Sequence, residues 1–184
     1  MTKQAIKYCI IIILALFAHK AIAQQYTEYD LKAAYVYNFS KFVSWPIQAF
    51  ETDTEDFKIV VFGDSPINKV LLKALKNRKI LNREISIKVI YRIKDLEDAH
   101  ILFVSKSMQH QSKEIIDLCE SKSILVVGDV IENFCQLGGT INFTRKSSKY
   151  RFEINNQSAK ESGLKISSKL LALARIISSE EIKF

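Results

Sequence analysis

The sequence predicts a single α/β domain of three layers, with a mostly parallel sheet core and an antiparallel hairpin at one edge. Strand and helix patterns alternate between residues 57 and 127, which is typical of parallel strands joined by crossover helices. Two segments of alternating polarity follow at 140–154, as expected of a hairpin with one solvated face. The chain has 184 residues, 48% of them hydrophobic, and shows no internal repeat or linker, so one domain is expected.

The first predicted element is an amphipathic helix over residues 29–43. Thr27 and Asp30 suit the capping of its first turn. Pro46 disfavours helical geometry in the residue before it, so the helix must end near Ser44. Apolar positions recur at helical spacing, and we expect them to form a buried aromatic face: Leu31, Ala34, Tyr35, Asn38, Phe39, Phe42 and Val43.

Four apolar segments predict the parallel core, at residues 57–62, 85–91, 101–104 and 124–127. All but the second are almost continuously apolar, which indicates strands covered on both faces. One crossover helix begins after Ser65 and Pro66, and another covers residues 109–119. The inward positions of these two helices are predicted to be Ile67, Val70, Leu71, Ala74, Ile115, Ile116, Leu118 and Cys119.

In the C-terminal third, segments of alternating polarity replace the continuous apolar runs. Residues 140–144 and 150–154 predict the two strands of the hairpin. Asn156 is expected to cap a short helix that Gly163 ends. Ser167 or Ser168 then caps a last helix in which residues 170–174 are apolar nearly all round, so this helix is either deeply buried or docks a partner.

Residues 1–23 predict a cleavable export signal. Lys3 and Lys7 precede an uncharged apolar run at 8–18, which is too short to span a bilayer because a spanning helix needs roughly 20 residues. Residues 21–23 (AIA) match the pattern that signal peptidase cleaves, so the mature domain is expected to cover residues 24–184. No cysteine follows for lipid attachment, and we therefore expect a periplasmic product without a membrane anchor.

Export also reduces the positive charge. The full chain carries +7, and removal of the signal takes three lysines from its 27 basic residues, leaving 24 against 20 acidic residues. The remaining basic residues are spread along the chain, which is typical of a solvated surface and argues against a nucleic-acid partner.

Two cysteines, Cys119 and Cys135, remain after export. In an oxidising compartment they form a candidate disulfide, which would stabilise the fold by about 3 kcal/mol. The alternative is two separately buried thiols, and both alternatives stay open because the geometry decides between them.

The sequence contains no motif that assembles a catalytic or cofactor site. Gly63 and Gly128 follow strands, but each is followed by Asp instead of a phosphate-binding pattern. His100 and His110 have no partner at metal-ligand spacing. Neither a nucleophile elbow nor a supported pair of carboxylates is present, so we expect no enzyme activity, no metal and no cofactor.

The candidate functional residues are therefore contact residues. Tyr37 lies off the predicted apolar face of the first helix, and Trp45 lies at its exit, so both are candidates for a partner surface. Arg151 and Glu153 are expected to point outward from the second hairpin strand and to orient the partner.

Several blocks of the mature chain form a pattern when taken together: residues 31–46 (LKAAYVYNFSKFVSWP), 61–64, 99–105, 138–141, 151–155 and 163–171. The opening block is similar to the first signature of the YfiR/HmsC-like family of exported bacterial proteins, and the later blocks occur in the order of that family.

The resemblance implies a periplasmic α/β protein without catalytic residues. Better-known members bind the periplasmic sensor region of a membrane diguanylate cyclase and repress it, which restrains cyclic-di-GMP and biofilm formation. Members are also associated with homodimers and with stabilising disulfides. His100 stands where relatives often have Cys, so the disulfide pairings of the family do not carry over to this chain.

Two other classes of function stay open. One is a periplasmic small-ligand-binding subunit of another sensor system, such as a histidine kinase. The other is an uncharacterised hydrolase.

Overall fold

The computed structural model describes residues 27–147 and 149–182, so the predicted signal peptide lies outside the described residues. A seven-stranded sheet forms the centre of the molecule, in the order β3-β2-β4-β5-β6-β7-β9. Neighbouring strands are parallel except for the antiparallel pair β6 and β7. The strands are β2 (Phe57–Phe62), β3 (Ile85–Ile90), β4 (Ile101–Val104), β5 (Leu125–Gly128), β6 (Ile141–Lys146), β7 (Lys149–Ile154) and β9 (Arg175–Ile176).

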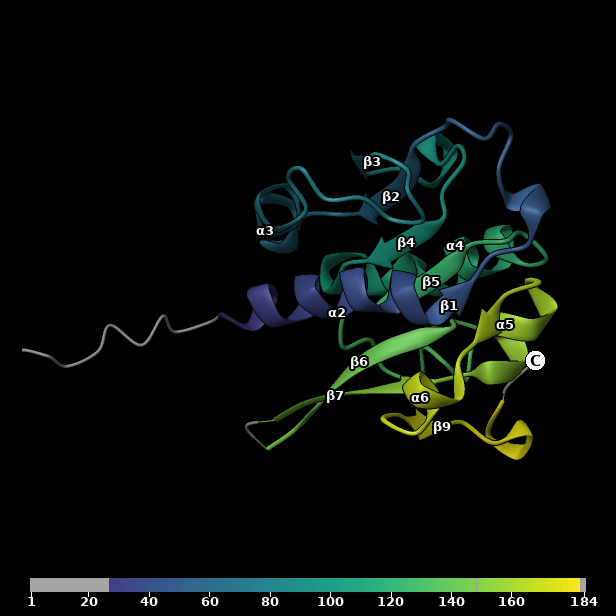
Figure 1. Cartoon of the computed structure of the whole chain (residues 1–184). Helices are drawn as coiled ribbons and strands as arrows, with labels where there is room; N and C mark the ends of the chain where they lie inside the picture. Colours follow the sequence, from purple (N-terminus) through teal and green to yellow (C-terminus); the bar gives the residue numbers. More distant parts are fainter. Residues whose placement is uncertain (1–26, 148, 183–184) are drawn as a thin grey trace, which may run out of the picture.

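Helices cover both faces of the sheet, which confirms the predicted three-layer α/β fold (Figure 1). The helices are α2 (Glu28–Phe42), α3 (Ile67–Ala74), α4 (Ser112–Cys119), α5 (Asn156–Glu161) and α6 (Ser168–Leu171). Buried side chains of α2, α3 and α6 pack on one face, and those of α4 pack on the other. Because both faces are covered, β4 and β5 are buried along their whole length.

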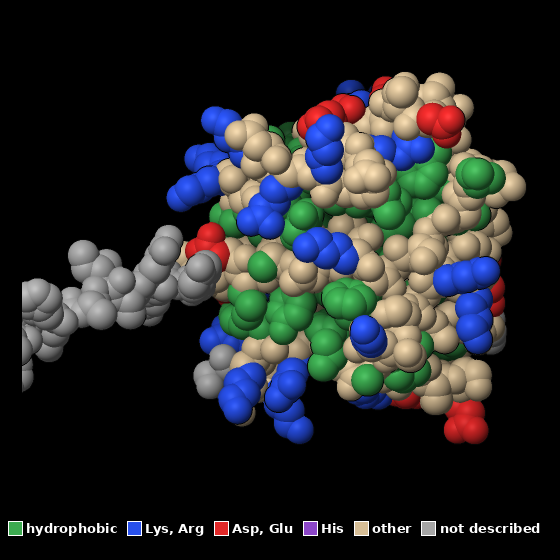
Figure 2. All heavy atoms as spheres, in the orientation of Figure 1, with side chains coloured by type: hydrophobic (Ala, Val, Ile, Leu, Met, Phe, Trp, Pro, Cys, Tyr) green, Lys and Arg blue, Asp and Glu red, His purple; other side chains and the backbone are tan. Residues whose placement is uncertain are grey.

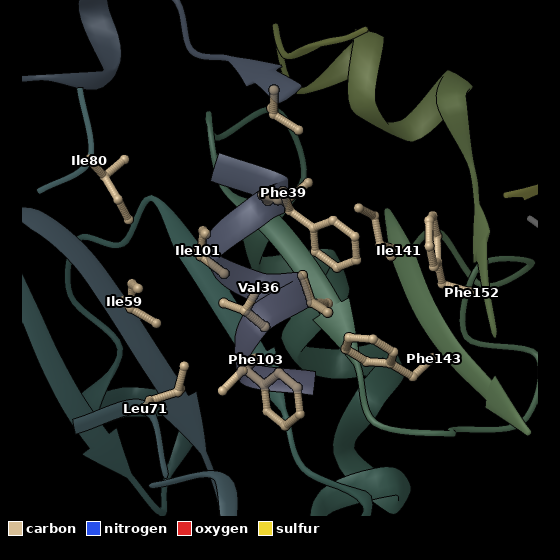
Figure 3. Packing of buried hydrophobic residues seen from close by; sticks show 14 of the residues in the cluster. Val36, Phe39, Ile59, Leu71, Ile80, Ile101, Phe103, Ile141, Phe143 and Phe152 are labelled. Carbon is tan, nitrogen blue, oxygen red and sulfur yellow. The ribbon is translucent and has the colours of Figure 1, made fainter. Parts of the chain in front are cut away.

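The two faces of the sheet are lined by alternate residues of the same strands. In β2, Ile59 and Val61 join the cluster under α2, whereas Val60 and Phe62 join the cluster under α4. Phe39 of α2 reaches into the first cluster among side chains of β4, β6 and β7 (Figure 3). Its ring centroid lies 5.3 Å from that of Phe152, in an edge-to-face arrangement.

Helix α2 forms where predicted, and Phe39 and Val43 are buried as expected, but most of the predicted buried face is not. Thr27 and Asp30 form the expected capping box, and the helix ends at Phe42 before the short strand β1 (Val43–Ser44). Its buried residues are Lys32, Ala33, Val36, Phe39 and Ser40, so the face is displaced by about one residue, which is about 100° on a helix. Leu31 and Phe42, expected inside, are 39% and 36% exposed.

The faces of the other crossover helices differ from the expectation at single positions. In α3, Ile67 and Leu71 are buried as predicted, but Ala74 is exposed and the following Leu75 is buried. In α4, Leu118 is 39% exposed, although its neighbours Ile115, Ile116 and Cys119 are buried.

The predicted hairpin is present as β6 and β7, and β6 continues the parallel sheet through two residue pairs with β5. The hairpin is not the outermost part of the sheet, because β9 pairs with β7 in parallel. A second sheet of two strands joins β1 to β8 (Lys165–Ile166) and ties the end of α2 to the C-terminal region.

Two predictions for the C-terminal region were inaccurate. The side chain of Asn155, not of Asn156, caps α5 by accepting a hydrogen bond from the Ser158 N–H. Ser167 caps α6 as expected, but this helix has one turn, and Leu173 beyond it is 66% exposed.

Candidate functional site

Of the aromatic contact residues predicted from the sequence, Tyr37 lies on α2 and Trp45 follows its C-terminal end, just after β1. Tyr37 is half-buried, and its ring stacks with cations: Lys41 Nζ lies 4.3 Å and the Arg78 guanidinium carbon 5.0 Å from the ring centroid. Trp45 is also half-buried, and its indole N–H donates to the carbonyl of His100 at 3.2 Å. Tyr37 therefore presents a basic, aromatic surface, whereas Trp45 has a structural partner.

The two predicted charged contacts are separated by the fold. Arg151 is exposed on β7, as expected. The prediction that Glu153 points into solvent was wrong, because Glu153 is 8% exposed. Its carboxylate accepts a hydrogen bond from the Asn142 amide and pairs with Arg175 of β9 at 3.2 Å. The C-terminal segment covers this position, and nothing in the local alternation of β7 indicates that cover.

The candidate disulfide is not formed, since Cys119 and Cys135 are both free and buried. Burial raises the pKa of the Cys119 thiol to about 11 and that of Cys135 well above its usual range. Cys135 also lies 3.6 Å from the carbonyl oxygen of Glu153. Both side chains belong to the apolar cluster under α4, so they act as small core residues in this structure.

A buried cluster of charged groups under α2 was not predicted. Lys32 is 1% exposed, and its ammonium donates to Asp129 Oδ1 at 2.5 Å and to Glu28. The Tyr150 hydroxyl of the hairpin donates to the same Glu28 carboxylate. The cluster therefore joins the first turns of α2 to the loop after β5 and to the hairpin.

Electrostatics keep this lysine charged. Burial opposes the charge, but the hydrogen bonds from Lys32 to Asp129 and Glu28 outweigh it and hold the lysine pKa above its usual value. The ring centroids of Tyr29 and Tyr150 lie 4.8 and 5.3 Å from the ammonium and add cation–π stabilisation. The sequence offers no signal for Lys32, because the side of the helix that it shares with Val36 was not the side predicted to be buried.

The turns that follow β2 and β5 are filled by protein side chains. A side chain at Gly63 would lie 2.2 Å from the Met108 side chain, and Gly63 has a φ of +97°. A side chain at Gly128 would lie 2.7 Å from Phe134, which is fully buried. These glycines therefore allow close packing of Met108 and Phe134 at the strand exits.

His100 is held by a set of specific contacts at the start of β4. Its Nδ1 accepts the Lys58 backbone N–H at 2.9 Å, so Nε2 carries the proton and donates to the Ala49 carbonyl at 3.1 Å. Its ring stacks with those of Phe50 and Phe57, with centroids 4.5 and 4.8 Å away. Burial lowers the pKa of the imidazole, despite the nearby Glu55 carboxylate. The neutral imidazole of His100 thus holds the loop after α2 in place through its contacts with Ala49 and Phe50.

The structure has two notable hollows. One of about 290 Å³ lies between α4 and α5, and one of about 410 Å³ lies beside His100, with Glu51, Glu55 and Asp98 among its lining residues. In residues 27–147 and 149–182, no group of three or more His, Cys, Asp or Glu side chains is arranged to hold a metal ion. No helix in the described part of the chain combines the length and the hydropathy needed to span a bilayer.

Comparison with known proteins supports one assignment. No curated protein matches the chain. A solved structure from Streptococcus pneumonia, described as the ABC domain in complex with L-Trp, is similar with a TM-score of 0.49 and 10% identity. That match covers 77% of this chain and 61% of the other, so this chain spans less than two thirds of that structure's length. The YfiR/HmsC-like family matches residues 29–175, which is most of the chain, and the protein therefore belongs to the YfiR/HmsC-like family.

Proposed function

We propose that this protein is a periplasmic regulator that represses an inner-membrane diguanylate cyclase by binding its periplasmic sensor region. The observation that carries the proposal is the family match over residues 29–175, which includes the sheet core and the hairpin. Periplasmic regulation of diguanylate cyclases fits that membership. The expected consequence is lower cyclic-di-GMP and less biofilm formation.

Such a repressor acts by binding and needs no chemistry of its own. It must bind the inactive conformation of the cyclase more tightly than the active one. A shift of that equilibrium from 1:99 to 99:1 needs a preference of roughly 5.5 kcal/mol, which a few buried contacts can supply. Tyr37, Trp45 and Arg151 stay proposed contacts because all three present side-chain surface to solvent, whereas the buried Glu153 is no longer proposed as a contact.

Export is part of the proposal. We propose that the chain is cleaved after Ala23 and that residues 24–184 act in the periplasm, with a homodimer as the state that the family resemblance implies. N-terminal sequencing of protein from the periplasmic fraction is expected to begin at Gln24. A chain that begins at Met1 in that fraction would contradict cleavage, and light scattering of the purified product tests the dimer.

Gene deletion tests the regulatory role. Deletion is expected to raise cyclic-di-GMP and surface attachment, and a plasmid copy should restore both. Membrane cyclases with a periplasmic region are then deleted one at a time in the same strain. Removal of the true partner should abolish the effect of the first deletion, and purified periplasmic region of that cyclase should bind the mature protein.

One result would replace the proposal with the ligand-binding alternative. If deletion leaves cyclic-di-GMP unchanged while a periplasmic histidine-kinase sensor loses its response, the protein serves that sensor instead. The hollow of about 290 Å³ between α4 and α5 is the feature that favours this second function, because its size is near the lower end for small-ligand sites. A thermal-shift screen of small metabolites would then show stabilisation by one ligand class.

A further inference from the structure

Helix α2 has apolar residues on the side that faces away from the sheet. We call this outward stripe the α2 surface and define it as the apolar residues Leu31, Ala34 and Phe42 with the polar Asn38 between them. These positions are spaced by three or four residues, so they lie on one side of the helix, and all four are exposed. Leu31 and Phe42 are 39% and 36% exposed, so each of these large apolar side chains presents part of its surface to solvent.

The α2 surface is unusual because the opposite side of the same helix already packs on the sheet. A helix at the surface of a globular protein normally has one apolar side and one charged side. Figure 2 shows hydrophobic side chains exposed along the line of α2, between groups of basic side chains. An apolar stripe outside the core indicates an interaction surface.

Both flanks of the α2 surface are basic. On one side, α3 and its exit carry Lys69, Lys73, Lys76 and Arg78; on the other, the β6–β7 hairpin carries Arg145, which lies opposite Tyr150 on the α2 side of the sheet. Contacts place both groups beside α2, since Arg78 stacks on Tyr37 and Tyr150 of the hairpin bonds to Glu28. None of these five side chains forms a salt bridge with another residue of the described chain.

We propose that the α2 surface docks an acidic, amphipathic segment of the partner protein. The inference rests on the proposed function, in which the partner is the periplasmic region of a membrane protein. Apolar residues of that segment would cover Leu31 and Phe42, and its carboxylates would meet the two basic flanks. The apolar stripe supplies desolvation energy, and the flanks steer and orient the segment.

Charge and shape select this occupant over two others. A second copy of the chain placed face to face would bring basic flanks against basic flanks, which is unfavourable. An anionic membrane would match the charge, but an inserted apolar face must lie about 5–10 Å deep in the headgroup region. Leu31 and Phe42 are only 39% and 36% exposed, so more than half of each residue is already covered by its neighbours and little apolar surface is left to insert.

Site-specific cross-linking identifies the occupant. A photoreactive benzoylphenylalanine replaces Asn38 in one variant and exposed Lys94, near the α4 side, in a control variant. After illumination of intact cells, the cross-linked peptides are sequenced. We expect the Asn38 variant to label a segment rich in Asp and Glu within the periplasmic region of a membrane protein, and the Lys94 variant not to label it.

The identity of the labelled protein separates the two proposals. A diguanylate cyclase supports both, whereas an acidic segment of another membrane sensor supports the α2 surface and overturns the proposed function. Labelling of a second copy of this chain, of no protein, or of the same peptide from Lys94 overturns the α2 surface. Binding to vesicles of phosphatidylethanolamine with roughly 30% phosphatidylglycerol, lost on charge reversal of Lys69 and Lys73, would assign the surface to the membrane instead.

Charge reversal measures the contribution of the basic flank. Lys69→Glu with Lys73→Glu on α3 is expected to weaken binding of the labelled partner region by about tenfold or more. The matched control pair, Lys94→Glu with Lys113→Glu, makes the same change of charge on exposed positions near α4 and should leave binding unchanged. Equal losses from both pairs would indicate a general charge effect and would overturn the proposed contact.

Discussion

Lys32 is an unusual residue in the packing of α2, because it is a charged side chain buried beneath the helix. A buried ammonium has a large desolvation cost, and here Asp129, Glu28 and two aromatic rings offset it. Such a buried ion-pair cluster contributes little to the net free energy of unfolding. Removal of one charged side chain is nevertheless costly, because its partner is left buried without a compensating charge. We interpret it as a contact that fixes how α2 sits over the loop after β5.

Substitution of Lys32 tests this interpretation. Lys32→Met is expected to lower the free energy of unfolding by about 3–5 kcal/mol, because Asp129 would be left as an uncompensated buried charge. Asp129→Asn in the same chain should recover part of the loss, and urea denaturation of both single variants and the double variant measures the coupling. If the two single losses simply add, the two side chains do not interact as described.

His100 gives stability a pH dependence. Burial lowers the pKa of its imidazole in the folded state, so the unfolded chain binds a proton more readily. The contribution of His100 is thus fully present above about pH 6.5 and is lost as the pH falls from there through the lowered pKa. Protonation would also break the hydrogen bond from the Lys58 N–H to Nδ1.

The comparison of His100→Asn with the unsubstituted protein isolates this effect. Asn offers an oxygen to the Lys58 N–H but does not titrate, so the variant should lose less stability than the parent between pH 6.5 and pH 4.5. Chemical denaturation at several pH values measures the two slopes. Parallel slopes would show that other groups cause the pH dependence.

At the scale of elements, patterns of apolar residues identified β2 to β7 and the helices, but neither the two-residue strands nor every buried face. The strands were predictable because continuous apolar runs such as those of β4 and β5 have few alternative explanations. The face of α2 was not, because apolar residues occupy two sides of the helix and the buried side contains Lys32 and Ser40. Only contacts with Asp129 and Tyr150, remote in sequence, reveal which side is inside.

Truncation of two phenylalanines of α2 distinguishes its sides. Phe39 is fully buried, so Phe39→Ala is expected to lower the free energy of unfolding by about 3–5 kcal/mol. Phe42 is 36% exposed, and Phe42→Ala should cost less than half as much. Urea denaturation measures both, and a loss below about 1 kcal/mol for Phe39→Ala would place its side chain at the surface.

At the scale of the whole molecule, the sequence predicted the layers but only part of the candidate site. Arg151 is exposed as expected from the alternation of its strand, whereas Tyr37 is half-buried and packs partly against the core. Glu153 is covered by β9, a strand of two residues that no pattern of alternation could indicate. The basic flanks of α2 come from segments far apart in sequence, so they appear only after the chain has folded.

The sheet also makes the molecule one cooperative unit. Alternate residues of β2 and β4 belong to the clusters on opposite faces, so neither cluster can be lost while these strands stay packed. The single tryptophan, Trp45, lies against Phe57 of β2, with ring centroids 5.1 Å apart, and reports on the loop fixed by His100. Its fluorescence is a local probe, whereas far-ultraviolet circular dichroism follows the whole sheet and all helices.

We therefore expect the two probes to report the same urea midpoint for the mature protein. Phe39→Ala serves as the control, because it perturbs the cluster under α2 and should move both midpoints together. If Trp45 fluorescence changed at lower urea than circular dichroism, the loop after α2 would unfold before the sheet. The contacts of His100 would then hold that loop less firmly than the core, and the molecule would contain two units of different stability.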